Sequence, residues 1–238
     1  LVTGVQTCAL PIFQALASAL GGVPYVILTD QEEAFLDGYA VQISCPHALR
    51  RWHGKAGDTA FAAIGGGSIQ LGIIRASGVV ENPVSLPYGI YPLVEACDGD
   101  IDNAGKVLKG ILDEHYAKHT YDVLVVLGRH WRALGDVVCA KEHVLETKDI
   151  RSQLISATHR ESKYFKAYGT ARVKDCAEFL PLSAAMLRRI AKHFDAKRVV
   201  FLDTSIRNVI GHYLHKLDTD PFTPPPRGLE RLFSRAAP

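Results

Sequence analysis

Short apolar runs alternate with longer amphipathic stretches along most of this sequence. Compact runs rich in β-branched residues predict buried strands, and apolar positions spaced three or four apart predict helices that cover a sheet. On this basis we expect strands at residues 24–29, 59–64, 68–75, 79–86, 122–127 and 198–202. We expect helices at 13–20, 31–44, 90–96, 101–119, 129–140, 182–194 and 206–217, and a polar, mostly helical stretch at 145–180.

The order of these elements indicates a fold class. The strands at 59–64, 68–75 and 79–86 follow one another with short turns, whereas helices separate the later strands. An antiparallel meander followed by alternating helices and strands is typical of a mixed α/β sheet covered by helices.

The composition changes this picture little, because 47% hydrophobic and 22% charged residues are ordinary for a soluble globular enzyme. The net charge of +2 argues neither for nor against nucleic acid, and no apolar run is long enough to span a membrane. We therefore expect no DNA and no membrane partner. The five cysteines are widely spaced without a Cys-x-x-Cys pair, which predicts reduced, mostly buried residues of a cytoplasmic protein.

Both ends of the chain depart from the pattern. Residues 1–12 lack a basic region and a periodicity that continues, and they resemble a translated adaptor or cloning artefact, so we expect a non-native segment. Residues 218–238 are rich in proline and are expected to form a disordered tail. The sequence is therefore expected to be a fragment.

Gly65, Gly66 and Gly67 stand between two expected strands and precede Ser68. Glycine can adopt positive φ and lets a backbone approach a ligand closely. Successive N–H groups in such a turn form a concave nest for phosphate oxygens, and the Ser68 hydroxyl adds a donor. The alternative is a glycine-rich hairpin without a ligand, because a glycine triplet alone is a weak signal.

Two carboxylates, Glu32 and Glu33, lie upstream of this turn in the helix expected at 31–44. Asp30 is expected to cap that helix, whose dipole favours carboxylates in the first turn. A carboxylate held near a phosphate can orient or deprotonate an attacking water. The alternative is a solvated first turn with no chemical role.

Five short motifs extend this pattern in order along the chain. They are Ile27-Leu28-Thr29-Asp30-Gln31-Glu32-Glu33-Ala34, Ile64-Gly65-Gly66-Gly67-Ser68-Ile69-Gln70-Leu71, Ser85-Leu86-Pro87-Tyr88-Gly89, Leu127-Gly128-Arg129-His130-Trp131-Arg132-Ala133-Leu134 and Phe201-Leu202-Asp203-Thr204-Ser205-Ile206-Arg207-Asn208-Val209. In these five motifs, taken together, the sequence resembles the exopolyphosphatase and guanosine pentaphosphate phosphatase (Ppx/GppA) family. The family patterns include Ser-Gly-x-Glu-Glu-Ala, Asp-Ile-Gly-Gly-Gly-Ser-Thr-Glu-Leu and Ser-Leu-Pro-x-Gly.

The resemblance implies a mixed sheet of the ribonuclease-H-like (actin-like ATPase) type, with helices on both faces and part of the first domain missing. It divides residues 13–217 into the remainder of a first subdomain at 13–75 and a second subdomain at 76–217. It implies cleavage of terminal phosphoanhydride bonds, usually with Mg²⁺. The expected ligand is polyphosphate or a guanosine polyphosphate such as guanosine pentaphosphate, and a homodimer is the protein partner considered.

By the resemblance, Glu33 takes the place of the catalytic glutamate that activates water. Gly65, Gly66, Gly67 and Ser68 take the place of the second phosphate loop. The family's first phosphate loop, Asp-x-Gly-Ser-Asn-Ser, is not found in the sequence.

Two positions beside the glycines depart from the family pattern. The family's aspartate is Ala63 here, and its glutamate is Gln70. The resemblance assigns both acids to Mg²⁺ or its waters, and hard cations need anionic oxygen ligands, so we assign no metal ligand. Phosphoryl transfer depends on neutralising developing charge, and the loss of both acids is expected to slow it severely.

The sequence therefore leaves two functions open. One is a phosphoanhydride hydrolase with Glu33 as base, and the other is a catalytically inactive member that senses polyphosphate or nucleotide by binding it. A kinase-type ATPase of the same superfamily would need an adenosine-binding motif, which the sequence does not show.

Three further features have a chemical and a structural interpretation. His115 and His119 lie four apart on an expected helix and could share a metal, but no third ligand is evident and surface histidines are favoured. Trp52 and Trp131 are interpreted as packing residues. A basic stretch could line a polyanion channel, although a solvated helical face is favoured. It contains Arg151, His159, Arg160, Lys163, Lys166, Arg172 and Lys174, with Tyr164 and Tyr168.

Overall fold

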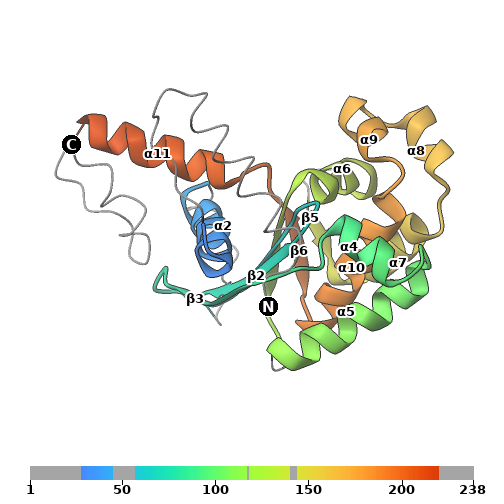
Figure 1. Ribbon diagram of the computed structural model, residues 1–238, viewed down its shortest axis with the longest axis horizontal. Helices are drawn as coiled ribbons and strands as arrows, with labels where there is room; N and C mark the ends of the chain where they lie inside the picture. The colour runs from blue at the N-terminus through green and yellow to red at the C-terminus, as the bar shows by residue number, and fades with distance from the viewer. Residues whose placement is uncertain (1–27, 45–56, 117, 140–143, 220–238) are drawn as a thin grey trace, which may run out of the picture.

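The computed structural model describes residues 28–44, 57–116, 118–139 and 144–219. At its centre is a six-stranded mixed sheet with the strand order β3-β2-β1-β4-β6-β5 (Figure 1). β1, β4 and β6 pair in parallel, whereas β2, β3 and β5 run antiparallel to their neighbours. The strands are β1 (Thr59–Ile64), β2 (Ile69–Ile74), β3 (Val80–Leu86), β4 (Val123–Leu127), β5 (Val144–Glu146) and β6 (Arg198–Phe201).

Helices lie on both sides of this sheet. On one side, α2 (Asp30–Ser44) and α11 (Ile206–Thr219) pack against each other, at the left of Figure 1. The other helices lie on the opposite side, at the right of the figure. They are α4 (Ile90–Ala96), α5 (Ile101–His115), α6 (Arg129–Val138), α7 (Thr147–Thr158), α8 (Ser162–Tyr168), α9 (Ala171–Cys176) and α10 (Leu180–His193).

Successive residues of the central strands alternate between two hydrophobic clusters. Ala60 and Ala62 of β1 belong to the cluster shared with α5, α6 and α10, and Phe61 and Ala63 belong to the cluster shared with α2. Because both faces are covered, β1, β2 and β4 are buried at every position. This double burial explains why these strands are continuous apolar runs in the sequence.

The predicted fold class, a mixed α/β sheet with helices on both faces, is confirmed. The subdomain boundary placed between residues 75 and 76 falls in the turn between β2 and β3, which are neighbouring strands of one sheet. The sequence missed β5, a three-residue strand in a stretch expected to be helical. It pairs antiparallel with β6 at the sheet edge, and so short a strand has no periodicity to reveal it.

Several predicted helix boundaries were wrong; for example, α6 ends at Val138 rather than at 140, and α10 begins at Leu180 rather than at 182. The helix expected at 101–119 ends at His115, because Tyr116 is extended and its buried hydroxyl donates to the Asn82 carbonyl. The final helix, expected to end at 217, continues to Thr219 and so takes the first two residues assigned to the tail. The rest of the tail, segment 1–12, the helix at 13–20 and most of the strand at 24–29 lie outside the described residues.

The helix α2 has a different cap from the predicted one. Asp30 is already helical, and the Thr29 hydroxyl accepts a hydrogen bond from the Glu32 amide at 3.2 Å. In return, the Thr29 amide donates to the Glu32 carboxylate at 2.8 Å. This reciprocal pair is a capping box, and it fixes the start of α2 and the carboxylate of Glu32 together.

Gly128 joins β4 to α6 with a left-handed φ of 103°. A Cβ atom there would lie 2.3 Å from the Ile64 carbonyl oxygen. We expect Gly128→Ala to lower the free energy of unfolding by about 2 kcal/mol or more, since left-handed backbone with a Cβ costs roughly 1–2 kcal/mol before the clash is added. Urea unfolding followed by circular dichroism measures this loss.

The matched control is Gly110→Ala in α5, where an added Cβ meets nothing within 4 Å. That change should leave stability unchanged or raise it by up to about 1 kcal/mol, because glycine is a poor helix former. Equal losses in the two variants would contradict the strained geometry at Gly128.

Candidate functional site

Residues 65–68, called the glycine turn below, follow β1 at its carboxyl end. The connection from β4 to α6 lies against the same end, since Gly128 approaches the Ile64 carbonyl. β1 and β4 are parallel neighbours. Ligands of open α/β sheets bind outside the carboxyl ends of parallel strands, so the fold places the glycine turn where a ligand site is expected.

The backbone of the glycine turn is held by α4. The Gly65 amide donates to the Ser68 carbonyl at 2.9 Å. The Gly65 and Gly66 carbonyls accept from the amides of Ile90 and Tyr91 at 3.2 and 3.0 Å. Within the part of the chain that the structure describes, the Gly66 and Gly67 amides donate to no backbone carbonyl. The carbonyls are therefore engaged while these two N–H groups remain available to an anion.

The glycine turn does not use the positive φ that the sequence led us to expect. What glycine provides here is room for neighbouring groups to approach the backbone closely. None of the three has a left-handed φ. A Cβ at Gly66 would lie 2.8 Å from the Tyr91 ring, and one at Gly67 would meet nothing within 4 Å. Around the turn, the position that tolerates a side chain least is Gly89, where a Cβ would lie 2.4 Å from the Ser68 nitrogen. Gly89 therefore lets α4 dock onto the turn.

A row of three cross-strand neighbours lies beside the glycine turn. Ala63 pairs with Gln70, and Gln70 pairs with Ser85. The buried Gln70 amide nitrogen donates to the Ser68 hydroxyl at 2.6 Å and to the Ser85 hydroxyl at 3.1 Å. The Ser85 hydroxyl donates to the Glu33 carboxylate at 3.4 Å. A chain of hydrogen bonds thus connects Glu33 on α2 with Ser68 in the turn.

The two neighbouring glutamates have different roles in this arrangement. Glu32 is engaged in the cap of α2 through Thr29, as described above. Glu33 faces the row through Ser85 instead. The structure therefore separates a structural carboxylate from one that lies near the glycine turn, a distinction that the sequence left open.

Asp37 is a further acidic residue that the sequence reasoning missed. It follows Glu33 by one helical turn on α2 and is only 7% exposed. Burial, with the nearby charge of Glu33, raises the pKa of Asp37 to about 7. An aspartate among the buried apolar positions of α2, between Leu36 and Ala40, is the signal that could have revealed it.

The Mg²⁺ implied by the family resemblance does not fit the residues beside the turn. Ala63 offers no oxygen in its side chain, and the Gln70 amide already bridges two hydroxyls. Among the described residues, no group of three His, Cys, Asp or Glu side chains could hold a metal ion. Within the described parts of the chain, Glu33 alone supplies an anionic oxygen connected to the glycine turn by hydrogen bonds, and one carboxylate is a poor ligand set for Mg²⁺.

The other sequence candidates lie elsewhere or have structural roles. His119 follows the end of α5 and its ring contacts Tyr121, so it shares no helix face with His115. Both histidines are exposed, which confirms the favoured interpretation as surface residues. Trp131 is fully buried, and its indole N–H donates to the Ser183 carbonyl, which confirms a packing role. Trp52 lies outside the described residues.

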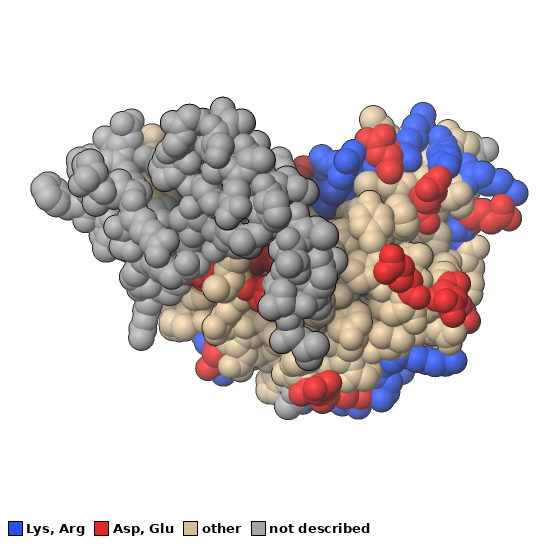
Figure 2. All heavy atoms as spheres, in the orientation of Figure 1, with Lys and Arg blue, Asp and Glu red and all other residues tan. Residues whose placement is uncertain are grey.

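The basic stretch is partly neutralised by acids. Lys166 pairs with Glu178 at 3.0 Å, and Arg172 pairs with Asp203 at 3.0 Å. Lys163 pairs with Glu161. Figure 2 shows blue and red side chains intermixed at the upper right, over α8 and α9. This arrangement favours the solvated face over a polyanion channel.

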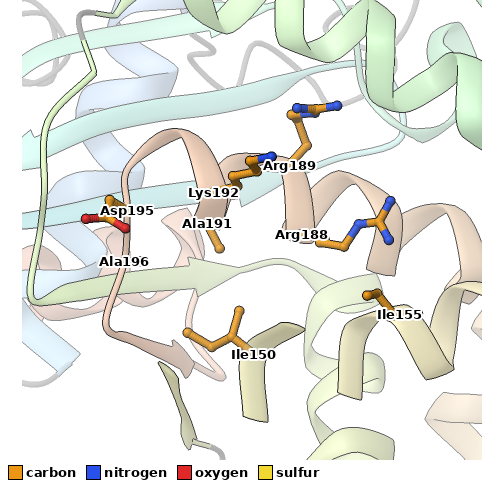
Figure 3. Close-up of a pocket in the computed structure, with 8 residues that line it drawn as sticks. All are labelled: Ile150, Ile155, Arg188, Arg189, Ala191, Lys192, Asp195 and Ala196. Carbon is orange, nitrogen blue, oxygen red and sulfur yellow. The ribbon is translucent and has the colours of Figure 1, made fainter. Parts of the chain in front are cut away.

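A separate cavity of about 490 Å³ lies between α7 and the second half of α10. It is close to Ala196, which precedes β6, and so lies toward the amino ends of the parallel strands. In Figure 3 the Arg189 and Lys192 side chains point away from Ile150 and Ile155 rather than converging with them. This cavity does not belong to the site at the glycine turn.

Known proteins resemble this chain in structure but not detectably in sequence. No family model and no curated protein matches the sequence. The solved structure of the Aquifex aeolicus PPX-GPPA enzyme matches with a TM-score of 0.66 and 17% identity, over 85% of this chain and 69% of that one. An exopolyphosphatase from Cytophaga hutchinsonii matches with a TM-score of 0.66 and 13% identity, over 85% and 70% of the two chains. The chain has the Ppx/GppA fold.

The Ppx/GppA fold confirms the architecture that the five motifs indicated. An exopolyphosphatase-like protein matches equally well, with a TM-score of 0.66 and 14% identity over 86% of this chain and 70% of that one. Likeness at this level of identity concerns the fold. None of the described helices has the length and apolar character needed to cross a membrane.

Proposed function

We propose that this chain is a Ppx/GppA-type phosphatase that binds a polyphosphate chain at the glycine turn and hydrolyses its terminal phosphoanhydride bond. The observation that carries the proposal is the hydrogen-bond chain from Glu33 through Ser85 and Gln70 to Ser68. It connects a carboxylate with the turn whose Gly66 and Gly67 amides have no backbone acceptor in the described parts of the chain.

The binding step uses donors that the fold leaves available. The Gly66 and Gly67 amides have no backbone acceptor among the described residues. The Ser68 oxygen accepts from Gln70, so the hydroxyl hydrogen is free to donate to a phosphate oxygen. These donors would surround the negative charge of the terminal phosphate and of the transition state.

The hydrolytic step would use Glu33 as a general base. A water oxygen attacks the terminal phosphorus, and its proton passes to the Glu33 carboxylate. The anhydride P–O bond breaks, releasing inorganic phosphate and a chain shorter by one phosphate. Ser85 donates to Glu33 and so orients the carboxylate for this role.

A second candidate function is binding without turnover. The neutral side chains of Ala63 and Gln70 favour it, because the row beside the turn lacks the carboxylates that a metal-assisted transfer would use. Such a protein would sense polyphosphate or nucleotide through the same glycine turn.

Two measurements on tripolyphosphate separate these functions. Calorimetry reports binding, and a colorimetric phosphate assay reports release, with and without Mg²⁺. Binding with release supports the phosphatase, whereas binding without release supports the sensor. Absence of both binding and release would overturn the proposed use of the glycine turn.

Gln70→Glu is expected to weaken tripolyphosphate binding about tenfold or more in the absence of divalent cations. The new carboxylate would accept hydrogen bonds from the Ser68 and Ser85 hydroxyls, which would withdraw the Ser68 hydrogen from phosphate. Loss of a hydrogen bond to a charged group costs about 1.5–3 kcal/mol, before charge repulsion is added. Calorimetry measures the change.

Gln42→Glu is the matched control, because it adds the same charge near the far end of α2, where Gln42 contacts Gly78. Its affinity for tripolyphosphate should stay close to that of the wild type. Similar losses in the two variants would indicate a general effect of net charge and would contradict the bridging role of Gln70.

A further inference from the structure

The row of cross-strand neighbours beside the glycine turn is uncharged on the face that α2 covers. Ala63, Gln70 and Ser85 are paired across β1, β2 and β3, so their side chains point to the same side of the sheet. Ala63 belongs to the hydrophobic cluster shared with α2, which identifies that side. A hydrated Mg²⁺ carried in by a phosphate chain would meet a methyl group, an amide and a hydroxyl in this row.

The Gln70 amide points hydrogen-bond donors at the place where a metal site needs acceptors. The side chain is buried, and its nitrogen lies 2.6 Å from the Ser68 hydroxyl oxygen and 3.1 Å from the Ser85 hydroxyl oxygen. Amide hydrogens carry partial positive charge and are donors only. Both hydroxyl oxygens already accept from this nitrogen, so the amide disfavours a cation beside the turn.

The glycine turn itself presents donors. Within the described residues, the Gly66 and Gly67 amides have no backbone acceptor, and the Ser68 hydroxyl hydrogen is free because its oxygen accepts from Gln70. Such donors bind most strongly to oxygens that carry full negative charge. Mg²⁺ neutralises two charges of a polyphosphate chain and takes some of its oxygens as ligands. The turn therefore favours the chain without the metal.

We infer that the ligand of the glycine turn is the metal-free polyphosphate anion, and that Mg²⁺ opposes its binding by converting it into a complex that the row accepts poorly. The inference rests on the proposed function and specifies the ionic form of its substrate. It reverses the role that the family resemblance implies for Mg²⁺, because Ala63 and Gln70 stand where that resemblance places acids. Mg²⁺ is then an antagonist of binding rather than a cofactor.

The first test is calorimetry of tripolyphosphate binding to the wild-type protein, once with EDTA and once with Mg²⁺ in excess over the ligand. NaCl brings both solutions to the same ionic strength, so that screening of charges is equal. We expect Mg²⁺ to weaken binding by about tenfold or more, the loss that follows when one hydrogen bond to a charged group is given up. Unchanged or tighter binding in Mg²⁺ overturns the inference.

The second test places carboxylates in the row. Ala63→Asp combined with Gln70→Glu adds two anionic side chains on the face that Glu33 reaches through Ser85. Mg²⁺ should then strengthen tripolyphosphate binding, which reverses the sign of the wild-type effect. Ala63 is buried, and a carboxylate there is costly to the fold. Gln70→Glu alone preserves the shape of the side chain, and in this variant Mg²⁺ should no longer weaken binding.

The matched control adds two carboxylates far from the row. Gln42→Glu combined with Ser77→Asp places them at the turn between β2 and β3, where Gln42 contacts Gly78 and Ser77 is exposed. This variant should keep the wild-type weakening by Mg²⁺, and circular dichroism shows which variants are folded. If folded Gln70→Glu responds to Mg²⁺ as the control does, the row does not determine the response and the inference is wrong.

The outcomes separate this inference from the proposed function. Binding in EDTA that Mg²⁺ does not weaken overturns the preference for the metal-free anion, while the phosphate site at the glycine turn stands. Binding that requires Mg²⁺ has the same consequence. Failure of tripolyphosphate to bind in either solution overturns the phosphate site and this inference together.

Discussion

Glu33→Gln is expected to reduce phosphate release from tripolyphosphate by at least about a hundredfold, because a positioned general base contributes 10²–10⁴-fold to a rate, by order of magnitude. Glutamine preserves the shape of the side chain and can still accept a hydrogen bond from Ser85, but it cannot take a proton from water. Binding of tripolyphosphate should change little. Initial rates of phosphate release, with calorimetry for affinity, measure both quantities.

The neighbouring glutamate provides a control on the same turn of α2. Glu32→Gln removes a carboxylate that is engaged in the capping box with Thr29. It should preserve the rate and affect mainly stability, by about 1 kcal/mol or less, since glutamine can occupy the same position in a capping box. If both variants lose activity equally, the assignment of the base to Glu33 is wrong.

The second large effect concerns Asp37 and pH. The pKa of Asp37 is raised in the folded protein to about 7 from an ordinary value of 3.8, by burial and then by the charge of Glu33. Between these two values the folded state holds a proton that the unfolded chain has lost. The stability contributed by this proton is fully present below about pH 4 and is lost as the pH rises toward 7. The loss amounts to as much as about 4 kcal/mol, at 1.36 kcal/mol for each pKa unit.

Asp37→Asn should therefore flatten the dependence of stability on pH between about 4 and 7. Urea unfolding at pH 5 and pH 8 measures the free energy of unfolding at each pH. At pH 8 the free energy of unfolding of Asp37→Asn should rise relative to that of the wild type. Asp30→Asn is the control, because Asp30 is exposed at the start of α2. If Asp37→Asn keeps the pH dependence of the wild type, the buried Asp37 carboxyl is not the cause of the loss of stability between pH 4 and 7.

Much of the fold could be predicted from the sequence because local pattern and tertiary position agree. The continuous apolar runs of β1 and β4 predict strands covered on both faces, which is what the two hydrophobic clusters provide. The predictions were wrong where tertiary contacts determine whether an element forms or where it ends. β5 exists through its pairing with β6, and α5 ends where Tyr116 turns into the core.

The candidate site was predictable only in part. The glycine turn and Glu33 could be named from the motifs, but nothing local to Gln70 reveals that its amide joins Ser68 to Ser85. That contact depends on the register of β2 and β3. Gly89 was part of a recognised motif, yet the docking of α4 onto the turn explains why it must be glycine.

The most direct test of the central claim is to observe where a phosphate chain binds. Backbone amide NMR of the 26.0 kDa protein, titrated with tripolyphosphate, reports each N–H separately. We expect the largest shifts at Gly66, Gly67 and Ser68. Shifts concentrated instead at Arg188 and Lys192 beside the α7–α10 cavity, with the glycine turn unmoved, would contradict the claim.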